Sequence, residues 1–297
     1  MSGDHAGMSQ APLDSSHQDF IPVSTLIAGI LRHAGGFDAF SVNVPALLRQ
    51  AFDEVIDAPR TSRFTLGETE KTEKTYVGTK VEILIRNYLG VPKGSVLDML
   101  IDGTEIDIKN TTGRDWMLPR EVLGKPALLV RSSEKTALCD IGVIICRPEY
   151  LRLSTNQDGK GQLSAAQHVN IWWILRQHPY PPNFWEVLSV ADRNEIMTSK
   201  GGTNRIAALF EKVQGKPISR QQVSALAQQH DYMKRIRRNG GARDVLAPKG
   251  IALLWGQRDR ALIDQLGLGP VTADEFVSFQ PKTAVDIALL RDAGHID

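Results

Sequence analysis

The sequence predicts an α/β fold in its first half, followed by a second, more helical domain. Three observations support this. Apolar residues recur at helical spacing before residue 90, short β-rich runs lie between residues 96 and 146, and a proline-rich segment follows residue 176. A chain of 297 residues is also longer than one hydrophobic core usually serves. We therefore expect a mixed sheet flanked by helices, joined to a separate C-terminal domain.

Composition and spacing give the expected domain boundaries. Residues 1–20 are polar and small, so they predict a disordered tail. The segment 177–183 contains three prolines, which remove backbone donors and favour extended chain, so it predicts a linker. This division assigns residues 21–176 to the α/β domain and residues 184–297 to the second domain.

Element by element, the first domain begins with two helices separated by Gly35 and Gly36, which break the helical pattern. Pro22 suits the start of the first helix. A third helix is expected to end at Gly90. The expected helices cover residues 23–32, 44–55 and 68–89, and the expected strands cover residues 96–101, 105–109, 127–131 and 136–146.

The second domain is predicted to contain helices near residues 184–189, 190–198 and 203–213. Ser219 and Gln222 form a capping box that starts a further helix. A basic helix over 230–238 follows, Gly240 and Gly241 end it, and residues 251–255 predict a strand. Helix, turn, basic helix and strand is the order of a winged helix-turn-helix domain.

The charge is unevenly distributed. The formal net charge of the chain is +1, but residues 193–260 alone carry +9. A concentrated positive charge attracts polyanions, which favours nucleic-acid binding over a solvated basic helix face. The expected DNA-binding residues are Lys234, Arg235, Arg237, Arg238 and Arg243.

Composition excludes several classes of protein. Hydrophobic residues make up 42% and charged residues 23%, which is typical of a globular protein and not of a disordered or fibrous one. No apolar run is long enough for a membrane span, and no secretory signal pattern opens the sequence. Cys139 and Cys146 lie in apolar runs, as buried reduced thiols do, so a cytoplasmic location is expected. Two cysteines without a paired motif make no structural zinc site.

The segment around Asp102 and Gly103 carries the chemistry. Asp-Gly between two β-rich runs predicts a two-residue hairpin turn. This turn places Asp98 directly opposite Asp107 on one face of the hairpin. Two adjacent carboxylates repel each other, so one must bind a proton or the pair must bind a cation, and Mg²⁺ suits such oxygen ligands.

Strand alternation places Lys109 on the same face as Asp107, whereas Leu97, Met99, Ile106 and Ile108 are expected to face the core. Asp98 and Asp107 would bind the metal, and Lys109 would orient a water molecule and add positive charge to the transition state of phosphodiester hydrolysis. The alternative is an edge hairpin with a solvated Asp–Lys pair.

Glu82, on the preceding helix, is the candidate fourth member of this set. It would hold a water molecule or a second ion. The alternative is a solvated helix position.

Glu82, Asp98 and the run 107–109 together resemble the PD-(D/E)XK nuclease superfamily, although Leu97 replaces the usual proline. Three longer motifs, at residues 71–83, 116–119 and 232–243, resemble the NaeI-type restriction endonucleases in the same order along the chain. This resemblance implies a type II enzyme that cleaves one DNA site while a second DNA copy is bound as effector.

The resemblance also implies a Mg²⁺-dependent homodimer that cuts a palindrome of the GCCGGC type. It further implies an N-terminal nuclease domain, a C-terminal winged-helix domain and a DNA methyltransferase in the same system. By motif position, Glu82, Asp98, Asp107 and Lys109 are the catalytic set, with the three acids as metal ligands. The basic residues of 234–238 and Arg243 are the second DNA-contact region. Two rivals are a winged-helix regulator with an inactive nuclease domain, and a nuclease that nicks DNA or reads modified cytosine.

Overall fold

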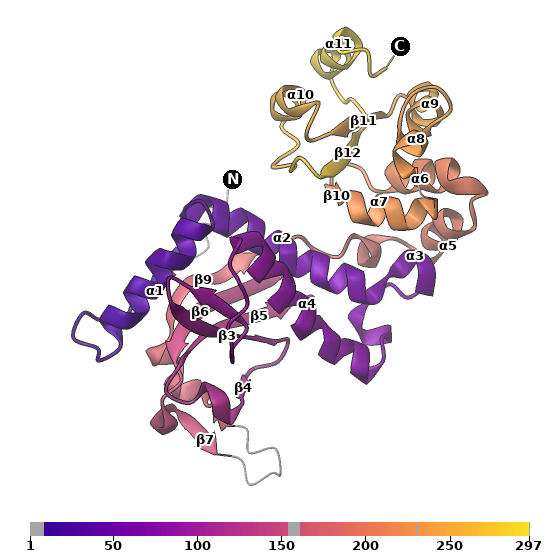
Figure 1. Ribbon diagram of the computed structural model, residues 1–297. Helices are drawn as coiled ribbons and strands as arrows, with labels where there is room; N and C mark the ends of the chain where they lie inside the picture. The colour runs from indigo at the N-terminus through magenta and orange to yellow at the C-terminus, as the bar shows by residue number, and fades with distance from the viewer. Residues whose placement is uncertain (1–8, 154–160, 230, 297) are drawn as a thin grey trace. The chain divides into compact units, whose positions relative to one another are not determined.

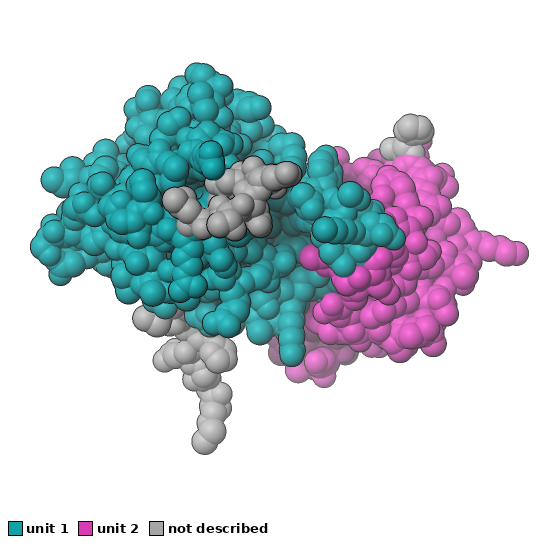
Figure 2. All heavy atoms as spheres, turned by 90° about the horizontal axis from the view of Figure 1, so that it is seen from below, with its two compact units in different colours: residues 1–55, 69–183 teal, residues 56–68, 184–297 magenta. Residues whose placement is uncertain are grey.

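The computed structural model describes residues 9–153, 161–229 and 231–296, and the chain forms two compact units (Figures 1 and 2). Unit 1 contains residues 1–55 and 69–183, and unit 2 contains residues 56–68 and 184–297. The segment 56–68 therefore belongs to unit 2, although the sequence analysis places it in the first domain. A local sequence pattern cannot predict this assignment, because the segment contacts residues of unit 2 that lie more than 100 positions away in the sequence.

Unit 1 is built on a six-stranded mixed sheet with the order β1-β9-β6-β5-β3-β2. β3 and β5 are parallel, and the other neighbours are antiparallel. The central strands are buried on both faces, which explains the apolar runs in their sequences. The strands are β1 (Ser9–Ala11), β2 (Met99–Ile101), β3 (Thr104–Thr111), β5 (Pro126–Ser133), β6 (Leu138–Ile145) and β9 (Trp172–Pro179).

A smaller antiparallel sheet and short 3-10 turns complete the β-structure of unit 1. Its strand order is β4-β8-β7. The elements are β4 (Met117–Leu118), β7 (Leu151–Leu153), β8 (Gly161–Leu163), η2 (Arg120–Val122), η3 (Pro148–Tyr150) and η4 (Ala165–Asn170).

Helices α1 (Phe20–His33), α2 (Phe37–Ile56) and α4 (Lys71–Leu89) surround the large sheet (Figure 1). α1 contacts β6 and β2, and α4 contacts β3. α4 begins with a capping box in which Glu73 accepts from the backbone N–H of Glu70, and it ends at Gly90 in the left-handed conformation. The expected Gly90 end is therefore confirmed, and the helix begins three residues later than predicted.

The N-terminal tail prediction is wrong for the described residues 9–19. β1 pairs with β9 at the edge of the sheet, and the side chain of Asp19 is fully buried against Arg147, with 2.6 Å between Oδ1 and NH2. The ordering contacts come from residues more than 120 positions away, so a local pattern cannot predict them. Residues 1–8 lie outside the described residues.

The linker prediction is also wrong in part, because residues 177–179 belong to β9. Pro179 tolerates this position because it ends the strand, where no further ladder bond is required. The chain returns to unit 2 after Asn183.

Unit 2 contains an antiparallel sheet with the order β10-β12-β11, surrounded by short helices. Its first helices are α3 (Ala58–Thr61), η1 (Leu66–Glu68), η5 (Phe184–Val187), α5 (Val190–Thr198) and α6 (Gly201–Lys212). They are followed by β10 (Ile218–Ser219), α7 (Arg220–Ala227), α8 (Tyr232–Ile236), α9 (Ala242–Leu246), η6 (Ala247–Lys249) and β11 (Ala252–Trp255). The unit ends with α10 (Arg260–Gln265), β12 (Glu275–Phe279) and α11 (Ala284–Asp292).

The N-cap half of the expected Ser219 capping box is confirmed, since the Ser219 hydroxyl accepts from the backbone N–H of Gln222 at 3.3 Å. The basic helix is shorter than predicted. It begins after Asp231, whose side chain caps it, and Arg237 is already extended, so Arg237 and Arg238 lie in the following turn. His230 lies outside the described residues.

Candidate active site

The hairpin formed by β2 and β3 has the predicted register. Met99 pairs with Ile106, Leu100 with Glu105 and Ile101 with Thr104. Asp102 and Gly103 both have positive φ, 49° and 85°, as a tight turn of this kind requires. The turn is held from outside by Arg32 of α1, which forms an ion pair with Asp102.

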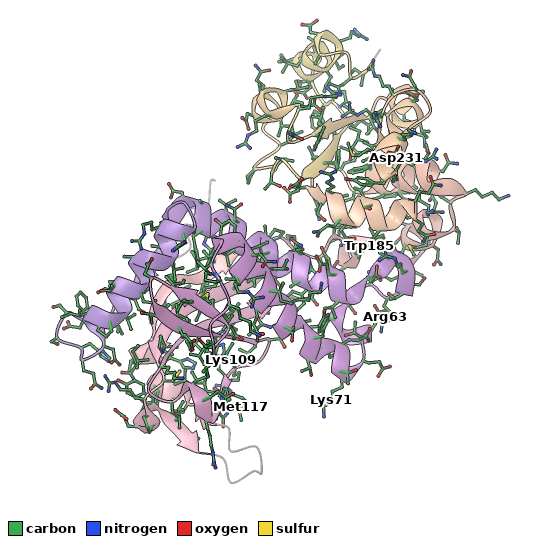
Figure 3. All side chains as sticks on the ribbon, in the orientation of Figure 1. Arg63, Lys71, Lys109, Met117, Trp185 and Asp231 are labelled. Atoms are coloured by element: carbon green, nitrogen blue, oxygen red, sulfur yellow. The ribbon has the colours of Figure 1, made fainter. Side chains whose placement is uncertain are left out.

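The acidic and basic side chains predicted to share one face are brought together (Figure 3 labels Lys109). The ammonium Nζ of Lys109 lies 2.9 Å from Asp107 Oδ1 and 3.7 Å from Asp98 Oδ2. Asp98 Oδ2 also accepts from the backbone N–H of Ile108 at 2.8 Å. Asp98 thus reaches across the hairpin to the strand that carries Asp107.

The opposite side chains anchor the hairpin. Met99, Ile106 and Ile108 are fully buried, and Leu97 is 2% exposed. Residues 104–106 of β3 pair with β2 and residues 107–111 pair with β5, so Asp107 and Lys109 lie where β3 is paired along one edge. The hairpin therefore lies at the edge of the sheet, as the alternative expects, but the burial of Asp107 argues against a fully solvated Asp–Lys pair. The side chain of Asp107 is only 6% exposed.

Burial and neighbouring charges shift the pKa values of the ionisable groups on this face. Burial raises the pKa of Asp107 to about 6, although Lys109 acts in the opposite direction, and the charge of Asp98 raises it further. Burial also raises the pKa of Glu82 to about 7, with the negative charge of Asp98 as the next cause. Burial lowers the pKa of Lys109, but Asp107 and the other acids outweigh it, so the net shift is upward. The face therefore holds more acidic groups than its one lysine neutralises.

Glu82 reaches this face from α4, which packs on β3. One helical turn later on α4, Arg86 donates from NH1 to the backbone carbonyl of Asp98 at 3.1 Å. Arg86 thereby fixes the strand end that carries Asp98. The sequence analysis missed this residue, and its i,i+4 spacing from Glu82 is the signal that marks both residues as neighbours on one helix face.

A metal fits the donor chemistry of this face. Asp107 Oδ2 is buried without a hydrogen-bond partner of acceptable geometry, even though Lys109 Nζ lies 2.9 Å from it. A buried carboxylate oxygen without a partner is costly, and a cation would satisfy it. Within the described ranges, no three Asp, Glu, His or Cys side chains are arranged closely enough to form a ready-made metal centre.

The predicted DNA-binding residues differ in exposure. Lys234, Arg237 and Arg238 are exposed, and Arg235 is partly exposed. Lys234 Nζ lies 3.2 Å from Asp231, the residue that caps α8 (Figure 3). Arg243 is different, because its side chain is only 10% exposed. Four of the five cations are thus available on a surface, and the fifth lies beneath it.

Comparisons with known proteins place this arrangement. A family model described as restriction endonuclease NaeI matches residues 31–286, a range that includes both the hairpin face and the basic segment. The Type II restriction enzyme NaeI of Lentzea aerocolonigenes is 33% identical over 231 residues, which cover 75% of this chain and 73% of that protein. The chain belongs to the NaeI family of restriction endonucleases.

Membership in the NaeI family confirms the resemblance drawn from the three motifs, and the family match covers residues 31–286. The chain is therefore an enzyme, a site-specific deoxyribonuclease, as the sequence analysis expects. Cys139 and Cys146 are both free and buried, also as expected. In the described part of the chain, no single helix is long and apolar enough to cross a membrane. The segments 20–33 and 37–61 are long and apolar enough together, but the chain bends by 78° between them.

Proposed function

We propose that the chain is a type II restriction endonuclease that hydrolyses phosphodiester bonds of double-stranded DNA with Mg²⁺, using a PD-(D/E)XK nuclease core. Its catalytic set is Glu82, Asp98, Asp107 and Lys109. The observation that carries this proposal is the hairpin register, which sets Asp98 and Asp107 on one buried face with Lys109 beside both. A stability role alone does not account for a partly buried face with three acids and one lysine.

Asp98, Asp107 and Glu82 are the residues that would hold Mg²⁺. When bound, the ion activates a water molecule and stabilises negative charge on the phosphate. Two observations support this assignment. Asp107 Oδ2 is buried and accepts no hydrogen bond of good geometry, and burial together with the neighbouring acids raises the pKa values of Asp107 and Glu82.

Lys109 has a separate task. Its ammonium group remains charged beside the acids, since their charges raise its pKa. It adds positive charge where a phosphate oxygen becomes more negative and orients the attacking water. The hydrogen bond from the backbone N–H of Ile108 to Asp98 keeps the two strands of the hairpin in this arrangement.

Unit 2 is proposed to be a winged helix-turn-helix domain that binds DNA through Lys234, Arg235, Arg237, Arg238 and Arg243. The order of elements, with α7, α8, β11 and β12 following β10, and the sheet order β10-β12-β11 support this. By family resemblance, the DNA held there is a second copy of the target that acts as effector.

The same resemblance supports a homodimer that recognises a palindrome of the GCCGGC type. A type II enzyme of this kind endangers the DNA of its own cell, so a methyltransferase that protects the same site belongs to the system, without needing to bind this chain. Sequencing the ends of cleaved genomic DNA would identify the target and the cut position together.

The test is cleavage of plasmid DNA with Mg²⁺ by the wild type, Asp107→Asn and Lys109→Ala. We expect double-strand breaks from the wild type and a loss of rate of at least about 10³-fold in both variants, because each removes a group that acts on the reacting phosphate. Asp38→Asn and Lys135→Ala change exposed residues outside the site and serve as matched controls.

Two outcomes would replace the proposal. If the wild type binds plasmid DNA but leaves it supercoiled, the chain is a DNA-binding regulator with an inactive nuclease domain. If it produces only nicks, or cleaves only DNA with modified cytosine, it is a different kind of nuclease. Methylated and unmethylated plasmids in parallel separate these results.

A further inference from the structure

A basic pocket of about 560 Å³ lies in unit 2, behind the turn that follows α8. Four arginines line it: Arg237 and Arg238 from the turn, Arg243 from α9, and Arg258 from the loop after β11. His295, from the segment after α11, also lines it. The pocket therefore collects basic residues from three segments that are distant in sequence.

The tight turn after α8 builds one wall of this pocket. A Cβ atom on Gly241 would lie 2.0 Å from the carbonyl oxygen of Arg237 and 2.8 Å from its nitrogen, so no larger residue fits there. The backbone folds back on itself at this point. This close approach sets Arg237 and Arg238 beside Arg243, which lies six and five positions later in the sequence.

The pocket has too little negative charge for its cations. Among the described residues that line it, Asp259 is the one acidic side chain. It accepts from Arg258 Nε at 2.8 Å and from the backbone N–H of Trp255 at 2.8 Å, and it lies 3.4 Å from Arg243 NH2 and 3.5 Å from His295 Nε2. One carboxylate thus contacts two arginines and a histidine, and the other described residues that line the pocket include no acid.

Arg243 is the arginine of this pocket whose hydrogen-bond donors are not all used. Its side chain is 10% exposed, and its Nε is buried without a hydrogen-bond partner. Burial lowers its pKa to about 10, and the positive charge of Arg258 adds to this. A buried guanidinium with an unused donor is costly unless an anion completes its hydrogen bonds. Arg258, by contrast, is half-exposed and reaches the same space from the solvent side.

We propose that this pocket binds a backbone phosphate of the DNA held by unit 2, with Arg243 and Arg258 as the phosphate-binding residues. Asp259 is a positioning residue, because it holds both guanidinium groups in place. The inference rests on the proposed function of unit 2 and goes beyond it, since Arg258 and His295 lie outside the basic motif. A phosphodiester is the anion that suits two converging guanidinium groups next to an exposed cationic turn.

The test compares Arg258→Gln with Arg260→Gln in the full chain. Arg260 is an exposed arginine two residues away that does not line the pocket, so it is the matched control. Binding to a short duplex with the GCCGGC palindrome is measured with Ca²⁺ in place of Mg²⁺ at several salt concentrations. We expect Arg258→Gln to weaken binding about 10-fold and to reduce the salt slope by about one phosphate, and Arg260→Gln to do neither.

A second arm identifies the phosphate. Duplexes with a single uncharged methylphosphonate linkage are scanned against the wild type and Arg258→Gln. The wild type should lose affinity at one linkage or a pair of symmetry-related linkages, and Arg258→Gln should be insensitive there. Thermal melting of both variants confirms that they are folded, and Arg258→Lys should recover part of the salt slope.

Equal binding and equal salt slopes for Arg258→Gln and Arg260→Gln would overturn the proposal. So would stabilisation of the wild type by inorganic phosphate, lost in Arg258→Gln, with no change in DNA binding, since the pocket would then serve a free anion. Plasmid cleavage by the wild type distinguishes this failure from a failure of the proposed function. If the wild type cleaves plasmid DNA but Arg258→Gln binds DNA as the wild type does, only the proposed phosphate site is refuted.

Discussion

At the scale of single residues, the backbone fold decides which charged side chains lie close enough to interact. Asp98 and Asp107 are brought together by a two-residue turn, and Asp259 contacts Arg243, Arg258 and His295 in unit 2. The first pair was predictable, because an Asp-Gly turn fixes the register of every residue around it. The Asp259 cluster was not, because Arg243, Arg258 and His295 are brought to it by tertiary packing and share no periodic spacing.

Asp259→Asn should destabilise unit 2 by about 3 kcal/mol, since it leaves buried cations without their carboxylate. Burial would raise the pKa of Asp259, but hydrogen bonds from His295, Arg258 and the Trp255 backbone lower it below its ordinary 3.8. A lowered folded pKa means that the stabilisation is complete above about pH 5 and is lost as the pH falls toward that pKa. Denaturant unfolding from pH 7 to pH 3 should show this decline in the wild type and not in the variant.

At the scale of elements, the sequence predicts best where local chemistry decides. The Gly90 helix end, the Ser219 cap and the β2–β3 turn each depend on neighbours within a few residues, and all three are confirmed. The prediction fails for β1 and for the first residues of the expected linker, which are ordered by pairing across the sheet. The strand and helices after residue 260 were not predicted, although residues 275–279 and 284–290 contain apolar runs.

Replacing either of two glycines by alanine should change stability, with opposite sign at the two positions. A Cβ on Gly142 of β6 would lie 2.5 Å from the Ile171 side chain and 2.9 Å from the Trp172 carbonyl oxygen, so Gly142→Ala should lower the stability of unit 1 by about 2 kcal/mol. Gly78 lies inside α4 with no atom within 4 Å of such a Cβ, so Gly78→Ala should raise stability by about 0.5–1 kcal/mol. Urea unfolding measures both, and a stabilising Gly142→Ala would contradict the close β6–β9 approach.

At the scale of the whole molecule, unit 2 is built from two segments that are far apart in the sequence. Residues 56–68 leave unit 1 and complete unit 2, where the ring of Phe64 lies 5.2 Å from that of Trp185 and Arg193 lies over the same ring. The backbone carbonyl of Pro59 accepts from Gln228 at 3.1 Å. A C-terminal fragment cut at residue 184 would therefore lack part of its own core.

Phe64→Ala should loosen unit 2 and spare unit 1, because the ring contact between half-buried Phe64 and buried Trp185 is lost only there. Hydrogen exchange followed by mass spectrometry should show faster exchange in α7 and unchanged exchange in β5 and β6. Tyr76→Ala, which truncates an exposed aromatic side chain on α4, is the control and should change neither. Faster exchange in β5 with α7 unchanged would assign Phe64 to the other unit.

The central claim is that the acidic face of the β2–β3 hairpin holds the catalytic metal. Calorimetric titration of Ca²⁺, which supports binding without turnover, into the chain bound to duplex DNA tests it most directly. We predict uptake by the wild type and by Asp38→Asn, and loss of that uptake in Asp107→Asn. Equal uptake by the wild type and Asp107→Asn would contradict the account, because the ion would then be bound elsewhere.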